Sequence, residues 1–138
     1  MTAIRKINDE LTIAGQLNAV QLQQIVLEGI KSVLNLRSPD EPGFLYAEQQ
    51  LAEAQGLYYV NLSVDIASLD DVSIALVLQT IHQLPKPILI HCDNAVRSVA
   101  FALIYIATSQ GATHQQAVQQ AERFGLFTTA QPTSIMQQ

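Results

Sequence analysis

Cysteine and basic residues are scarce in this sequence, and each shortage excludes a class of protein. The single cysteine among 138 residues cannot form an internal disulfide, which excludes a disulfide-stapled domain. Only 7 lysines and arginines stand against 12 acidic residues, for a net charge of -5. Because a phosphate backbone is held by clusters of positive charge, nucleic acid is not an expected partner.

Long apolar segments are also missing. The opening, MTAIRKINDELT, has no apolar stretch of the kind that a secretory signal needs, so a cytoplasmic location is expected. The longest apolar run, Val99 to Ala107, is far shorter than the roughly 20 residues that span a bilayer. We therefore expect no membrane association and interpret this run as a buried helix.

Hydrophobic residues, by contrast, make up 49% of the chain, which is enough to build a sizeable core. The length predicts one domain over residues 1–138, with a tail from about residue 126 that is loosely attached. Short apolar runs predict strands at 11–14, 32–36, 57–62 and 87–91. Amphipathic stretches between and after them predict helices, among them 46–55, 71–83 and 113–124. Leu45, Leu51 and Ala52 are expected on the inner face of the helix over 46–55, and Asn18 and Asp70 are expected N-caps. This alternation predicts the α/β class, with a mainly parallel sheet and helices on both faces.

Polar residues follow three of the predicted strands. Arg37 comes after the second strand, Asp65 after the third, and the segment HCDNAVRS, residues 91 to 98, after the fourth. In open parallel sheets ligands bind at the carboxyl ends of the strands, where such loops converge. The sequence therefore places a thiol, arginines and a candidate acid at one edge of the sheet.

The segment HCDNAVRS has the parts that a thiolate nucleophile requires. Backbone N–H groups that turn into a helix N-terminus can cradle an anion and stabilise the Cys92 thiolate. Arg97 can bind two oxygens of the anion, and Ser98 can donate a hydrogen bond to the sulfur. His91 can order the loop by bonding its backbone. The alternative is that Cys92 is a buried packing residue, a common role for a lone cysteine.

The Cys-x4-Arg-Ser loop, together with IRKINDELTIAGQ, GIKSVLNLRSPDE and GLYYVNLSV, resembles the phosphatase-like domain of beta-lactamase-hydrolase-like proteins. That domain lies within the superfamily of cysteine-dependent protein tyrosine and dual-specificity phosphatases. The likeness covers roughly residues 4 to 125. It implies a single-domain phosphatase-type fold, with a four- or five-stranded mainly parallel sheet flanked by helices.

The resemblance also implies a hydrolase of phosphoric monoesters that needs no cofactor or metal. Cys92 would take up the phosphoryl group as a thiophosphate, Arg97 would bind its oxygens, and Asp65 would protonate the leaving oxygen. The substrate would be a phosphorylated protein or a small phosphate ester. Arg37 is a further candidate anion ligand or, alternatively, a structural partner of Asp40 or Glu41. The remaining candidate substrate-binding positions form the loop itself: His91, Asp93, Asn94, Ala95, Val96 and Ser98.

Two departures from the phosphatase pattern leave other functions open. Four residues separate Cys92 from Arg97, one fewer than in active phosphatases and closer to the loops of rhodanese-type sulfurtransferases, which hold a persulfide. Ala95 stands where the family usually has glycine, and a Cβ is unfavourable there if φ is positive. Asp93, if it faces inward, would repel an anion. The alternatives are a sulfurtransferase or persulfide-handling domain that uses Cys92, and a non-catalytic anion-binding interaction domain.

Overall fold

A computed structural model describes residues 4–125, whose centre is a five-stranded sheet with the order β1-β2-β5-β3-β4. Strands β2, β5, β3 and β4 are parallel, and the short β1 adds an antiparallel edge. All four strands predicted from the sequence are present, and β1 was missed because it consists of two exposed residues. The strands span Arg5–Lys6 (β1), Leu11–Ala14 (β2), Ser32–Asn35 (β3), Tyr58–Asn61 (β4) and Ile88–His91 (β5).

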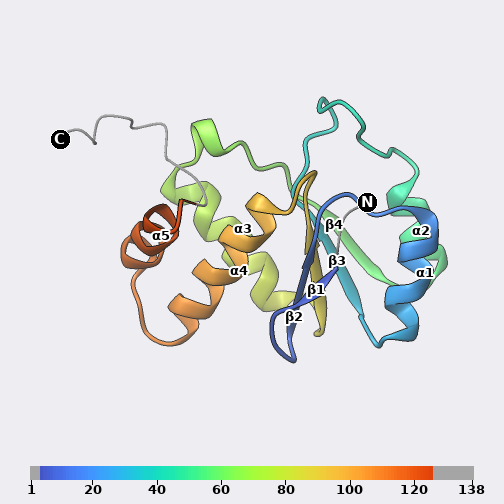
Figure 1. Cartoon of the computed structure of the whole chain (residues 1–138), viewed down its shortest axis with the longest axis horizontal. Coiled ribbons are helices and arrows are strands. Elements are labelled where there is room, and N and C mark those ends of the chain that lie inside the picture. Colours follow the sequence, from blue (N-terminus) through green and yellow to red (C-terminus); the bar gives the residue numbers. More distant parts are fainter. Residues whose placement is uncertain (1–3, 126–138) are drawn as a thin grey trace.

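Helices cover both faces of the sheet, as the alternation of strands and helices predicted (Figure 1). Helices α1 and α2 pack on one face, and α3, α4 and α5 lie on the other. Successive residues of a strand point to opposite faces of the sheet and therefore enter two separate cores. Leu89 lies in the core between the sheet and α1 and α2, whereas Ile88 and Ile90 lie in the core on the side of α3, α4 and α5. The helices span Ala19–Leu27 (α1), Glu48–Ala54 (α2), Asp71–Gln83 (α3), Val96–Ser109 (α4) and His114–Arg123 (α5).

Capping side chains begin three of these helices, two of them at the caps expected from the sequence. At the start of α1, the side-chain oxygen of Asn18 accepts a hydrogen bond from a backbone N–H of the first turn. Asp70 and Thr113 accept equivalent hydrogen bonds at the starts of α3 and α5. Such caps satisfy backbone donors that have no partner within the helix. The local sequence therefore determines where these helices begin.

Helix α2 differs from its prediction in both start and orientation. It begins at Glu48 rather than Tyr46, and Leu51, expected on the inner face, is 37% exposed. Ala52 is fully buried, as expected, and Glu48, one turn before it, is buried in place of Leu51. The prediction followed apolar residues, whereas the helix turns a carboxylate inward because polar partners for it lie at the end of the sheet.

Within residues 4–125 no helix is long and apolar enough to cross a membrane. The predicted loose attachment of the tail from about residue 126 concerns residues outside those that the structure describes.

Candidate functional site

The Cys92 loop lies at the carboxyl end of the central part of the sheet. Strand β5 ends at His91, whose register partners are Ala14 at the end of β2 and Asn35 at the end of β3. The chain then turns through residues 92–95 into α4. Three strand ends therefore surround the loop, which is the convergence that the order of strands and helices predicted.

Cys92 is fully buried at the base of this loop. Its N–H donates to the carbonyl of Ala14 at 3.3 Å, which continues the hydrogen bonding between β2 and β5. The Ser98 hydroxyl lies 3.3 Å from the Cys92 sulfur and 3.1 Å from the Ala14 carbonyl oxygen. A hydroxyl that donates to the sulfur stabilises a thiolate, which is the contact expected for Ser98.

Ala95 has the backbone conformation that makes a Cβ unfavourable. Its φ is 75°, in the left-handed region, and among residues 4–125 no other non-glycine residue has a positive φ. The strain is on the order of 1 kcal/mol. Asn94 supplies the cap that alanine lacks, because its side-chain oxygen accepts the Val96 N–H at 3.1 Å.

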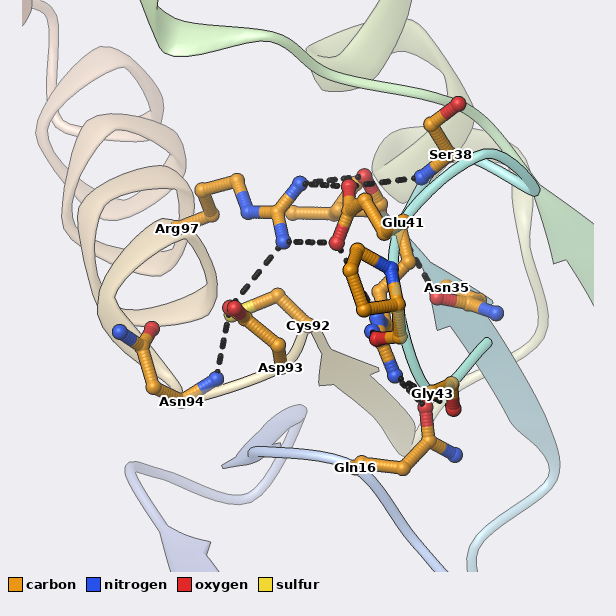
Figure 2. Close-up of polar contacts among 12 residues, drawn as sticks. Gln16, Asn35, Ser38, Glu41, Gly43, Cys92, Asp93, Asn94 and Arg97 are labelled. Carbon is orange, nitrogen blue, oxygen red and sulfur yellow. Dashed lines mark hydrogen bonds and ion pairs between the residues drawn. The ribbon is translucent and has the colours of Figure 1, made fainter. Parts of the chain in front are cut away.

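Arg97, on the first turn of α4, extends its guanidinium across the loop into an ion pair with Glu41 (Figure 2). Its two terminal nitrogens donate to the two oxygens of the Glu41 carboxylate at 2.7 and 2.8 Å. One of them also donates to the carbonyl oxygens of Leu36 and Val64. Hydrogen bonding to Glu41 raises the pKa of Arg97 above its ordinary value, so this group stays charged.

Asp93 reaches the same guanidinium from the loop itself. Its carboxylate accepts from Arg97 at 3.1 Å and from the N–H of Asn94 at 2.8 Å (Figure 2). The side chain is 49% exposed, so the carboxylate lies at the rim of the loop rather than in the interior. It occupies one backbone N–H and one Arg97 donor that an incoming anion would otherwise use.

Glu41 is a residue of this site that sequence reasoning considered only as a partner of Arg37. It lies in the loop after β3, where the Ser38 N–H donates to its carboxylate at 2.8 Å. The hydrogen bond from Arg97 is the main reason that the pKa of Glu41 falls from 4.5 to about 2. The sequence offered one indication of this role for Glu41: it is an acidic residue in a loop predicted to lie at the same edge of the sheet as the loop that carries Arg97.

Arg37 is buried behind Glu41, with its three side-chain nitrogens donating to the protein. Nε donates to Glu41 at 3.1 Å, and the terminal nitrogens donate to the Gln16 side chain and to the carbonyl oxygens of Pro42 and Gly43. Of the two roles considered from the sequence, these contacts correspond to the structural one, with Glu41 as the acidic partner.

An open cleft of about 830 Å³ extends from Arg97 to the loop after β4. Asp65 lines this cleft together with Asp93, Asn94 and Val96. The Asp65 carboxylate is exposed and accepts the Ala67 N–H at 3.0 Å, which caps the short 3-10 turn Ile66–Ser68. The structure thus brings the candidate acid and the Cys92 loop to one cleft.

His91 lies beneath the loop, fully buried. Its Nδ1 is 3.2 Å from the Cys92 carbonyl oxygen, the backbone contact that the sequence suggested, and its Nε2 contacts the Glu48 carboxylate. Sequence reasoning missed Glu48, because a glutamate at the start of a polar helix has no local feature that indicates burial. In residues 4–125 no cluster of His, Cys, Asp and Glu has the geometry to hold a metal ion.

Comparison with known proteins supports the phosphatase resemblance. No family model matches the chain. It is 29% identical over 108 residues to a beta-lactamase hydrolase-like protein of Agrobacterium fabrum, a match that covers 75% of this chain and 25% of the relative. A protein of the same name from Xylella fastidiosa is 31% identical over 97 residues, covering 67% and 22%. The chain thus spans about a quarter of the length of these curated relatives.

Solved structures share the fold at lower identity. A candidate phosphatase from Shewanella putrefaciens superposes with a TM-score of 0.73 at 24% identity, over 85% of this chain and 76% of that one. TpbA of P. aeruginosa, in complex with phosphotyrosine, superposes with a TM-score of 0.68 at 18% identity, over 89% and 74%. The chain is therefore a relative of one segment of the beta-lactamase hydrolase-like proteins, and it has the fold of the protein tyrosine phosphatase-like enzymes.

Proposed function

We propose that this protein hydrolyses phosphate monoesters through a thiophosphate intermediate on Cys92. The observation that carries the proposal is the Arg97 guanidinium, which binds two oxygens of the Glu41 carboxylate at the mouth of the Cys92 loop. A phosphoryl group presents oxygens to which the same fork can bind. The Glu41 carboxylate then stands where substrate oxygens would bind and must leave Arg97 when substrate enters.

The proposed reaction has two steps. The Cys92 thiolate attacks phosphorus, a sulfur–phosphorus bond forms, and the bond to the leaving oxygen breaks while Asp65 gives that oxygen a proton. Water then attacks phosphorus and gives a proton to Asp65. The sulfur–phosphorus bond breaks, which releases phosphate and restores the thiolate. Arg97 stabilises the charge on the transferred oxygens, and the Ser98 hydroxyl stabilises the thiolate when it leaves. The substrate class is a phosphorylated protein or a small phosphate ester.

Turnover of a small aryl phosphate tests the proposal. Cys92→Ser should abolish phosphate release, because a serine hydroxyl is a far weaker nucleophile at neutral pH. Asp65→Asn should lower kcat about 100-fold by removing the acid. Asp71→Asn is the matched control, because Asp71 lies in the first turn of α3 and does not line the cleft. The proposal is wrong if the native protein releases no phosphate or if Cys92→Ser releases it at the native rate.

A sulfurtransferase is the second candidate, favoured by the four-residue spacing between Cys92 and Arg97. In that reaction the Cys92 thiolate takes the outer sulfur of thiosulfate and releases sulfite, and cyanide then removes the sulfur as thiocyanate. A persulfide trapped on Cys92, with no aryl phosphate turnover, would support this candidate. Phosphate binding without turnover of either substrate would instead support a non-catalytic anion-binding domain, in which Asp93 and Glu41 modulate the Arg97 site.

A further inference from the structure

The cleft that would receive the substrate is lined by more acidic than basic side chains. Two arginines, Arg37 and Arg97, line it together with three carboxyl groups, those of Glu41, Asp65 and Asp93. Among the described residues that form its walls there is no lysine or histidine. A cleft that binds a phosphate group through charge alone needs the opposite balance, because like charges disfavour binding.

The positive charges of both arginines are already paired within the protein. Arg37 is buried, and its three side-chain nitrogens donate to Glu41, to Gln16 and to two carbonyl oxygens. Arg97 donates to both oxygens of Glu41 and to one oxygen of Asp93 (Figure 2). The pKa of Glu41, lowered to about 2 mainly by the hydrogen bond from Arg97, keeps this carboxylate charged at neutral pH. The cleft therefore offers a phosphate no surplus of positive charge.

The remaining basic residues do not line the cleft. Lys31 and Lys86 stand just before β3 and β5, at the amino ends of these parallel strands, whereas the cleft lies at the carboxyl ends. Arg5 and Lys6 form β1, and Arg123 ends α5. These five and the two arginines of the cleft are all the lysines and arginines of the chain. No further lysine or arginine of this protein is left to balance the charge of a bound phosphate.

Two carboxyl groups of the cleft each keep one oxygen free for a ligand. Asp93 uses Oδ1 for its contacts with Arg97 and with the Asn94 N–H, and its side chain is 49% exposed. Asp65 is exposed and uses Oδ1 for the Ala67 N–H. Within residues 4–125 the Oδ2 atom of neither residue has a hydrogen bond, and Asp65 has no ion pair. Both side chains can therefore bind a cation that enters the cleft.

We propose that the substrate supplies the missing charge: it is a phosphate monoester whose leaving group carries an ammonium or guanidinium group, and Asp93 selects for that group. This inference rests on the proposed function and names its substrate class. The phosphoryl group binds Arg97, and the leaving group extends toward Asp65, which protonates the leaving oxygen. A positive charge on the leaving group then lies near the Asp93 carboxylate and near Asp65 once it has lost its proton. An additional negative charge there is repelled, which excludes strongly anionic phosphate esters.

Three benzylphosphonates that differ only in charge test the proposal on the native protein. They carry an aminomethyl, an ethyl or a carboxymethyl group opposite the phosphonate, and their phosphorus–carbon bonds are not hydrolysed. In calorimetric titrations the aminomethyl compound should bind about fivefold more tightly than the ethyl compound, and the carboxymethyl compound should bind more weakly than either. The preference should disappear in about 1 M salt, which screens exposed charges. Equal binding of the three compounds, or a preference that persists in high salt, overturns the proposal.

Asp93→Asn tests the residue that is proposed to select the cation. The substitution releases one donor of Arg97, so all three compounds should bind more tightly, but the ratio of aminomethyl to ethyl binding should fall at least twofold. Asp40→Asn is the matched control, because it removes the same charge from an exposed residue outside the cleft and should leave the ratio unchanged. An equal ratio in both variants overturns the role of Asp93. Should Asp93→Asn fail to fold, the salt dependence of the native ratio decides.

A peptide that carries the phosphonate analogue of phosphotyrosine between two lysines identifies the source of the cation. Tighter binding than that of the aminomethyl compound indicates a protein substrate, and weaker binding indicates a small molecule; either result supports the proposal. None of these measurements uses turnover. If the protein hydrolyses an aryl phosphate but binds the three phosphonates equally, only this inference fails. If it prefers the aminomethyl compound but releases no phosphate, only the proposed hydrolysis fails.

Discussion

Two acid–base pairs meet the Cys92 loop, and they differ in how firmly the protein holds them. His91 and Glu48 are fully buried, and their polar side-chain atoms contact each other, Tyr59 of β4, the Gln16 side chain and the Cys92 carbonyl oxygen. Arg97 and Glu41 border an open cleft, and their side chains are 12% and 23% exposed. In the proposed function an entering anion competes with Glu41 for Arg97, whereas Glu48 is shielded from solvent. The comparison indicates a fixed support for the thiol and an exchangeable partner for the arginine.

Removal of the acid from each pair should give the largest difference. Glu48→Ala leaves the polar groups of His91, Tyr59 and Gln16 in the interior without the carboxylate that they contact, and we expect the free energy of unfolding to fall by about 3 kcal/mol or more. Glu41→Ala should lower it by only about 1 kcal/mol, because water can solvate Arg97. Urea unfolding of the two variants and the native protein measures both values. Equal losses would contradict the division into a fixed and an exchangeable pair.

Anion binding should sharpen the comparison. Glu41→Gln weakens the competitor for Arg97, and phosphate should then bind about tenfold more tightly, because the free guanidinium becomes the dominant state. Asp40→Asn is the matched control: it removes the same charge from an adjacent exposed residue that does not line the cleft. Calorimetric titration with phosphate measures the affinities. If both variants bind phosphate equally, the effect is one of net charge and Glu41 does not compete for Arg97.

The smallest expected effect concerns the loop backbone. Ala95→Gly should raise the free energy of unfolding by about 1 kcal/mol, because glycine adopts φ of 75° without a Cβ clash. Ala75→Gly, at an exposed position within α3, should lower the free energy of unfolding by about the same amount, because glycine is less favourable than alanine inside a helix. Thermal unfolding of both variants measures the opposite signs. A destabilised Ala95→Gly variant would show that the loop is not strained.

Sequence reasoning located the loop correctly but described only part of its surroundings. The position of Cys92 after a buried strand, the Ser98 contact and the positive φ at Ala95 follow from a strand that turns directly into a helix. Glu41 lies 56 residues from Arg97, and Glu48 lies 43 residues from His91. Such pairs depend on the conformation of loops and on the rotation of α2 about its axis, which local preferences do not specify.

The amino-acid sequence by itself determined the alternation of strands and helices, most helix starts and the short Cys-x4-Arg-Ser loop at the end of β5. These features depend on neighbouring residues: apolar period, caps and breakers act within a few positions. Only the tertiary structure decided that α2 buries Glu48 instead of Leu51 and that Arg97 meets Glu41 and Asp93. The reason is that the free energy of a buried or shared charge depends on partners that the fold brings from distant parts of the chain.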